Sequence, residues 1–212
     1  MARLFCDISM SLDGYVAGPN QTLEDPLGEG GERLHEWVFG LKPFREAHGM
    51  EGGEVNADAE IVQEKLDATG AEIMGRHMFS GGSGPWADDP NAAGWWGDDP
   101  PFRGSVFVLT HHAREPLTLG ATTFTFVTDG IESALEQARA AAGDRDVLVS
   151  GGADVVQQYL RAGLLDELNL HVAPILLGGG VRLLDGLDPG EVECTRAISS
   201  PAVTHLRYRV VR

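Results

Sequence analysis

Positive charge is scarce in this chain, and long apolar segments are missing. The 212 residues include 16 Lys and Arg against 32 Asp and Glu, which gives a formal net charge of −16. A protein that binds nucleic acid or an anionic membrane through charge needs cations that face phosphates. We therefore expect neither partner. No apolar run approaches the roughly 18 residues of a membrane span and no secretory leader is visible, so we expect a cytoplasmic location.

Cysteine and the common catalytic signatures are also scarce. The two cysteines, Cys6 and Cys194, are too few for a disulfide framework or a cysteine zinc site. We expect both to be buried small apolar side chains, and we expect no metal site. The sequence contains no Gly-x-Ser-x-Gly, no His-Glu-x-x-His, no phosphate-loop Gly-Lys-Ser/Thr and no deaminase His-x-Glu with Pro-Cys-x-x-Cys. These absences argue against the enzyme classes that use them.

The hydrophobic pattern alternates between the periods of strands and helices. Apolar positions predict strands over residues 4–10, 71–75, 105–110, 123–128, 146–151, 167–173, 191–199 and 203–211. They predict helices over 57–66, 131–142 and 153–163, and one more between 28 and 53. This order is typical of an α/β fold with a mixed, mostly parallel sheet, helices on both faces and antiparallel C-terminal strands. We expect one domain over 1–212, with a Gly/Pro/Trp-rich insertion at about 81–101.

The segment from Asp146 to Gln157 runs from an apolar strand through Gly151 and Gly152 into a helix. Paired glycines let the backbone approach a ligand closely, and the next helix presents unpaired N–H groups and its positive dipole end. This arrangement suits a phosphate ligand. A tight strand-to-helix turn without a ligand explains the pattern equally well. In so acidic a chain a phosphate site needs its own nearby arginine, histidine or helix ends.

Several motifs occur in an order that is known from one superfamily. They are Ser11-Leu12-Asp13-Gly14-Tyr15-Val16-Ala17, then Gly75-Arg76, Thr110, Gly151-Gly152, and Pro174-Ile175-Leu176-Leu177-Gly178-Gly179-Gly180. With these motifs the chain resembles the dihydrofolate reductase superfamily. It is most similar to the branch formed by the reductase domain of bacterial riboflavin biosynthesis and its stand-alone relatives. The resemblance spans nearly the whole chain and implies the dihydrofolate reductase-like fold.

The resemblance implies a site for NADPH. In the family, the Gly-Arg segment holds cofactor phosphates, the pair at Thr110 faces the 2′-phosphate, and the glycine pair, joined by a cis bond, lies beneath the pyrophosphate. The implied cofactor-binding residues are Val16, Ala17, Gly75, Arg76, His77, Met78, Thr110, His111, Ser150, Gly151, Gly152, Ala153, Asp154 and Val155. Two positions depart from the family: His77-Met78 lacks a common phosphate-binding hydroxyl, and His111 stands where many relatives have arginine or lysine.

Candidates for the substrate side are fewer. Asp13 is the most plausible catalytic polar group near the nicotinamide end, because its loop caps the first strand, but it equally suits a turn before Gly14. The tryptophans Trp86, Trp95 and Trp96 lie in a polar loop with little core of its own. We expect them to cover the substrate pocket or a partner surface.

The preferred interpretation is an NADPH-dependent reductase that transfers a hydride to a small heterocyclic substrate, pyrimidine-like or pterin-like. The alternative is a catalytically silent nucleotide-binding or antifolate-binding protein of the same fold, because a fold does not determine function. The resemblance also implies a homodimer. We expect its contact at the apolar final strands and at Leu176-Leu177, since an uncovered apolar edge invites aggregation.

Overall fold

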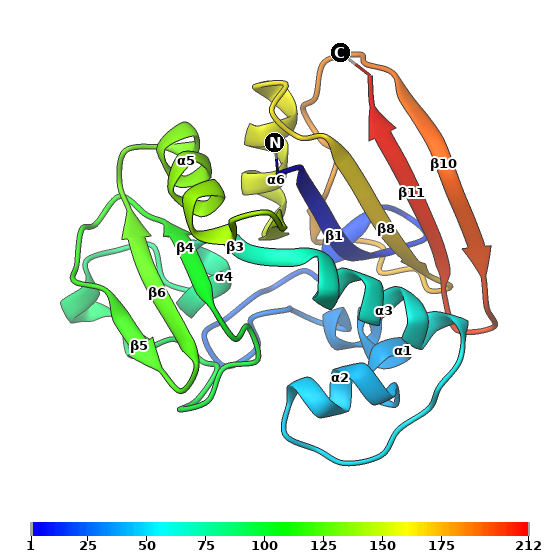
Figure 1. Ribbon diagram of the computed structural model, residues 1–212, viewed down its shortest axis with the longest axis horizontal. Coiled ribbons are helices and arrows are strands. Elements are labelled where there is room, and N and C mark those ends of the chain that lie inside the picture. The colour runs from blue at the N-terminus through cyan, green and yellow to red at the C-terminus, as the bar shows by residue number, and fades with distance from the viewer. Residues whose placement is uncertain (1, 212) are drawn as a thin grey trace.

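A mixed sheet of nine strands forms the centre of the computed structural model, which describes residues 2–211 (Figure 1). The order across this sheet is β10-β11-β8-β1-β7-β3-β4-β6-β5. The bounds are β1 (Leu4–Ser11), β3 (Thr69–Gly75), β4 (Ser105–Leu109), β5 (Leu117–Leu119), β6 (Thr122–Val127), β7 (Asp146–Gly151), β8 (Glu167–Ala173), β10 (Val192–Ser199) and β11 (Thr204–Val210). A separate two-stranded sheet joins β2 (Tyr15–Ala17) and β9 (Val181–Arg182).

Helices connect these strands and pack on both faces of the sheet. The α-helices are α1 (Glu36–Phe39), α2 (Lys42–Ala47), α3 (Ala57–Ala68), α4 (Arg76–Ser80), α5 (Ile131–Ala142) and α6 (Ala153–Arg161). Two 3₁₀ turns, η1 (Gly31–Leu34) and η2 (Trp86–Asp88), add to them. In Figure 1, α1, α2 and α3 group together on the sheet face opposite to α5 and α6.

The central strands run parallel. The pairs β8·β1, β1·β7, β7·β3, β3·β4 and β4·β6 are all parallel, whereas β11, β10 and β5 join their neighbours in antiparallel fashion. Six strands therefore end at one edge of the sheet, where the segments that follow them meet. The expected mixed sheet with antiparallel C-terminal strands is confirmed.

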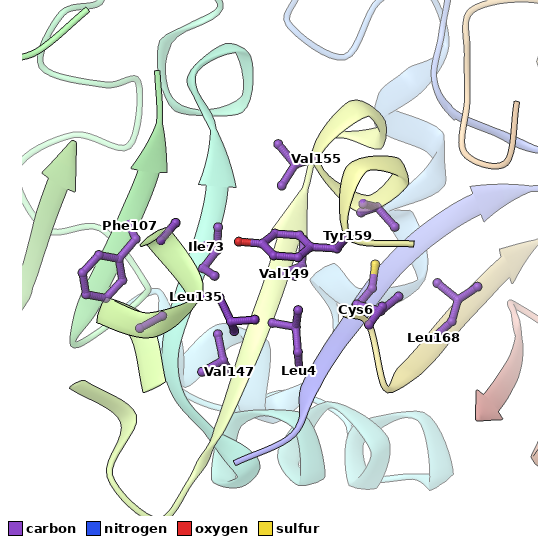
Figure 2. Close-up of a cluster of buried hydrophobic side chains, with 14 of the residues drawn as sticks. Leu4, Cys6, Ile73, Phe107, Leu135, Val147, Val149, Val155, Tyr159 and Leu168 are labelled. Atoms are coloured by element: carbon purple, nitrogen blue, oxygen red, sulfur yellow. The ribbon is translucent and has the colours of Figure 1, made fainter. Parts of the chain in front are cut away.

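The main apolar core lies between the sheet and the helices α5 and α6 (Figure 2). Alternate residues of β1 and β7, such as Leu4 and Val149, point into it and are fully buried. Tyr159 of α6 crosses this core and donates its hydroxyl to the carbonyl of Ile131 at 2.7 Å, so its polar end is satisfied. Burial raises the pKa of Tyr159. This layer holds α6, and thus the glycine pair before it, against the sheet.

A second apolar cluster fills the opposite face under α4 and the loop of residues 81–101, for which the name insertion is kept. It contains Met74, Phe79, Val106, Val108, Phe124 and Phe126. Phe79 makes edge-to-face contacts with Phe124 at 5.1 Å and with Trp86 of the insertion at 5.9 Å. Such aromatic pairs stabilise a structure beyond the area that they bury. The insertion is therefore anchored on the sheet by an aromatic side chain.

Beside this cluster, the sheet face under α3 is polar. A buried chain of hydrogen bonds runs from Asp7 through His171 and His205 to Asp58, with ring-to-carboxylate distances of 3.0 Å at both ends. The Nδ1 atoms of the two histidines lie 2.7 Å apart. Trp37 of α1 packs on both rings, with centroids 4.9 and 5.1 Å away. Elements β1, β8, β11, α1 and α3 are thus joined by one buried polar network.

The geometry of this network determines how many protons the two histidines share. Each Nε2 atom faces a carboxylate and donates to it, and the contact between the Nδ1 atoms needs one proton. The pKa of His205 is lowered, first by burial and then by the neighbouring His171. His171 and Lys65 hold the pKa of Asp7 at about 2, although burial acts in the opposite direction.

Some local expectations differ from the structure. One helix was expected between residues 28 and 53, but η1, α1 and α2 share this range, because Gly40 ends α1 and the extended Leu41 precedes Pro43 at the start of α2. Strands β5 and β9 were not expected, since three and two residues are too short to show a period. Cys194 is exposed rather than buried, because it lies on the edge strand β10.

Acid should weaken the fold through its buried histidines. Burial, then the positive charges of Lys65 and His171, lower the pKa of His35 to about 4, and His205 shifts the same way. In the unfolded chain these histidines become protonated below the ordinary histidine pKa of about 6.5. In the folded protein they become protonated only at lower pH. We predict that the free energy of unfolding falls between pH 6.5 and 4, by about 1 kcal/mol per pH unit for His35 alone.

Urea denaturation at a series of pH values checks this slope. His35→Gln should flatten it, and His77→Gln, which changes an exposed histidine, should leave it unchanged. A free energy of unfolding that stays constant from pH 6.5 to 4.5 in the wild type contradicts the prediction.

Candidate functional site

The carboxyl edge of the parallel strands brings most of the predicted site residues together. Asp13 follows β1, Arg76 follows β3, Thr110 follows β4, and Gly152 follows β7. The Gly178 loop follows β8. Because neighbouring parallel strands end at the same edge, these segments face a common region. In open α/β sheets such an edge is the usual place for a ligand.

The glycine pair forms the centre of this edge. The bond between Gly151 and Gly152 is cis, as the resemblance implied, and Gly152 caps the nine-residue helix α6. A Cβ atom at Gly152 would meet no other atom within 4 Å, so open space lies beside it. A Cβ atom at Gly75 would instead lie 2.9 Å from Cγ2 of Val155, so β3 and α6 approach closely. The backbone at Gly152 is therefore accessible next to the positive end of a helix.

Arg76 is buried, and the insertion surrounds its side chain. Its Nε atom donates to the hydroxyl of Ser80 at 2.8 Å, and its guanidinium forms an ion pair with Asp89. The ring of Trp86 lies 3.2 Å from its Cζ atom. Its buried Nη1 atom finds no hydrogen-bond partner among residues 2–211. Arg76 was predicted to hold cofactor phosphates. In the structure its guanidinium is paired with the carboxylate of Asp89.

Further basic groups lie around Trp86. The Cζ atom of Arg114 is 4.5 Å from the Trp86 ring, and burial followed by the charge of Arg76 lowers the pKa of Arg114. The indole of Trp86 donates to the carbonyl of His112 at 2.6 Å. Thr110 is buried and accepts the backbone N–H of His112 at 3.1 Å, whereas His111 is exposed. This part of an acidic protein thus concentrates cations at the ends of β3 and β4.

Asp13 holds the turn that follows β8. Its two carboxylate oxygens accept the backbone N–H groups of Leu177 at 3.1 Å and Gly178 at 2.8 Å. The hydroxyl of Ser11, followed by these amides, lowers the pKa of Asp13 to about 2. Asp13 is therefore ionised at neutral pH and cannot be the proton donor of a reaction there. Its geometry suits the positioning of the Gly178 loop.

Most of the remaining predicted cofactor residues are either apolar residues packed in the fold or polar residues bonded to other side chains. Val16 and Ala17 are buried in β2, next to the partner strand β9, and Ala153 and Val155 are buried in α6. The sulfur of Met78 lies 3.3 Å from the position of a Cβ atom at Gly151, so Met78 belongs to the glycine edge.

Two polar members of the predicted set have partners within the protein. The hydroxyl of Ser150 donates to Glu72, whose pKa is raised by burial, and Asp154 accepts the amide of Gln158 at 2.7 Å. These two side chains are therefore engaged by the protein itself.

Sequence reasoning missed Asp89 and Arg114 as members of this site. Asp89 lies 13 residues after Arg76 in a loop without hydrophobic period, so no pattern could pair the two residues. The three tryptophans of this loop were expected to cover the substrate pocket or a partner surface, and the ring of Trp86 lies over Arg76. Within residues 2–211, no group of three or more His, Cys, Asp or Glu is placed to hold a metal ion. None of the helices described is long and apolar enough to cross a membrane.

Known proteins resemble this chain in sequence and in fold. The family model described as the RibD C-terminal domain matches residues 2–206. The riboflavin biosynthesis protein RibD of Corynebacterium ammoniagenes is 41% identical over 64 residues, which are 28% of this chain and 19% of that protein. The match thus covers under a fifth of that curated relative.

Solved structures share the fold at low identity. A putative riboflavin biosynthesis protein from Shewanella sp. PV-4 superposes with a TM-score of 0.66 at 20% identity, over 100% of both chains. A diaminohydroxyphosphoribosylaminopyrimidine deaminase/5-amino-6-(5-phosphoribosylamino)uracil reductase from Thermotoga maritima superposes with a TM-score of 0.57 at 13% identity, over 99% of this chain and 57% of that one. At such identities the likeness establishes the fold.

The close contact at Gly75 generates a stability prediction. In Gly75→Ala the new Cβ atom meets Val155 at 2.9 Å, so β3 and α6 must separate. We expect a loss of about 1–3 kcal/mol in the free energy of unfolding. The control is Gly84→Ala, whose Cβ atom would meet nothing within 4 Å. Thermal melting of both variants measures the difference, and an unchanged melting temperature for Gly75→Ala would show that this contact is not tight.

Proposed function

Because the chain belongs to the RibD C-terminal domain family, we propose that it is a reductase that uses NADPH. The proposed reaction is transfer of a hydride to a small heterocyclic substrate, pyrimidine-like or pterin-like. The observation that carries this proposal is the accessible backbone at Gly152, which lies at the positive end of α6 and at the same sheet edge as the cations that follow β3 and β4. The name of the Thermotoga maritima neighbour, a uracil reductase, supports an aminopyrimidine substrate.

The residues at the edge fit a dinucleotide cofactor. The amides of Ala153 and Asp154 at the start of α6 suit the pyrophosphate, because the first N–H groups of a helix lack partners within it. Thr110 and His111 are proposed to face the 2′-phosphate, and Arg76, which is linked to this segment through Trp86, is proposed to hold the same phosphate. Val16 and Ala17, close to the end of β1, are proposed to contact the nicotinamide end. NADPH, when bound, would supply the hydride.

The chain itself would position the substrate and exclude water. Asp13 would keep the Gly178 loop in place through its two backbone contacts. Since Asp13 is ionised at neutral pH, another group has to supply the proton of the reaction. Hydride transfer depends chiefly on orientation, so no strong nucleophile is needed at this edge.

The alternative, a nucleotide-binding or antifolate-binding protein without turnover, is favoured by one observation. Asp89 occupies the guanidinium of Arg76, which weakens the phosphate site that the family uses. The two functions are separated by mixing the protein with NADPH and an aminopyrimidine that carries a ribosylamino group. A reductase oxidises NADPH, and absorbance at 340 nm falls; a silent binder leaves the absorbance constant.

Cofactor binding gives a direct test. Calorimetric titrations with NADPH and with NADH should show that the protein binds NADPH more tightly than NADH. His111→Ala should weaken NADPH about three- to tenfold and leave NADH unchanged, because an exposed hydrogen-bonding contact to the 2′-phosphate is removed. His48→Ala, a change in the exposed ring stacked on Phe44, is the matched control. Absence of binding of both nucleotides would remove the basis of the reductase proposal.

We also propose that the chain forms a homodimer. Exposed apolar side chains lie on the C-terminal part of the fold, including Leu176 (67% exposed), Val192 (52%) and Leu184 (47%). Strand β10 is an edge strand, whose unpaired backbone groups favour association. Light scattering at micromolar concentration should give twice the chain mass of 22.7 kDa, and Leu176→Glu should shift it toward the monomer. A wild-type monomer at this concentration contradicts the proposal.

A further inference from the structure

The guanidinium of Arg76 is already paired with a carboxylate of the same chain, that of Asp89. Asp89 lies on the insertion, and its carboxylate accepts from Arg76 and, at 2.7 Å, from the hydroxyl of Ser80. Its other oxygen accepts the backbone N–H of Asn91 at 2.9 Å. The side chains of both ion-pair partners are buried, with 7% and 3% exposed. Hydrogen bonds from Ser80 and Arg76 lower the pKa of Asp89 against the effect of burial, so the carboxylate is charged.

One donor of Arg76 is left unpaired by this arrangement. Its buried Nη1 atom has no hydrogen-bond partner in the described chain, and Arg114 contributes a second cation close to Trp86. The cluster of Arg76, Arg114 and Asp89 therefore keeps one net positive charge. An unpartnered buried donor next to this charge is the kind of group that an oxygen-rich ligand satisfies.

The carboxylate of Asp89 affects the two nucleotides differently, because only NADPH carries a 2′-phosphate. The 2′-phosphate of NADPH carries nearly two negative charges, and Asp89 repels it and competes for the same guanidinium. The 2′-hydroxyl of NADH is neutral and donates a hydrogen bond to a carboxylate, which is how an acidic residue selects NAD in dinucleotide-binding folds. Asp89 therefore weakens the binding of NADPH and does not weaken the binding of NADH.

We propose that Asp89 is a specificity-determining residue that competes with the 2′-phosphate of NADPH for Arg76 and so lowers the preference of the site for NADPH over NADH. This inference rests on the proposed function, since it requires that Arg76 belongs to the cofactor site. It predicts that NADPH binds at this subsite only when Asp89 moves away from the guanidinium, together with the loop that carries it.

The experiment compares dissociation constants of NADPH and NADH for three proteins by calorimetry. In Asp89→Asn the competing charge is removed, and NADPH should bind about tenfold more tightly while NADH changes less than about threefold. Asp88→Asn is the matched control, because it makes the same change in net charge at an exposed neighbouring carboxylate that has no ion pair with Arg76. It should alter the ratio of the two constants less than about twofold.

A second measurement uses the wild type, because loss of a buried ion-pair partner can unfold Asp89→Asn. Hydrogen exchange of the Asn91 amide, which Asp89 accepts, should become faster with bound NADPH than with bound NADH. Equal ratios of the two dissociation constants in Asp89→Asn and Asp88→Asn overturn the inference while the proposed function stands. Unchanged Asn91 exchange with saturating NADPH overturns it in the same way. Failure of all three proteins to bind either nucleotide ends both proposals.

Discussion

One face of the sheet depends on the buried chain from Asp7 through His171 and His205 to Asp58. A helix normally packs on a sheet through apolar side chains, yet here α3 meets charged and hydrogen-bonded groups of three strands. Each carboxylate is acceptable in the interior because a ring nitrogen satisfies it, helped at Asp7 by Lys65 at 3.7 Å, and the two rings satisfy each other. Loss of one member leaves a buried polar group without its partner in the chain. The network therefore restricts α3 to one position across β1, β8 and β11.

The same sheet determines where chemistry is possible. Since six neighbouring strands are parallel, residues that are far apart in sequence, such as Asp13, Gly75 and Gly152, follow strand ends at a common edge. The core under α5 and α6 keeps the glycine pair against β3, where a Cβ atom at position 75 would press on Val155. Cations gather at this edge although the chain as a whole carries a net charge of −16. Local arrangement, and not overall charge, decides whether this edge can attract an anion.

Sequence reasoning placed the long periodic elements well and the short ones poorly. Helix 131–142 and strand 167–173 agree with the structure, because each repeats its apolar spacing over several residues. The prediction of one helix within residues 28–53 was wrong because Gly40 and Pro43 divide this range into shorter helices. The strand ends of the site were predictable from motif order. Contacts such as that between His205 and Asp58, which are 147 residues apart, depend on tertiary packing that no local pattern contains.

The insertion shows how packing and charge become coupled at this edge. Trp86 anchors the loop on Phe79 and Phe126, and the same loop carries Asp89 to Arg76. A ligand that displaces Asp89 therefore also disturbs an aromatic contact, and its binding free energy is reduced by the cost of that rearrangement. The ion pair lies directly against this anchor, because the Trp86 ring is 3.2 Å from the Cζ atom of Arg76. The packing of the loop thereby sets how strongly the ion pair resists a ligand.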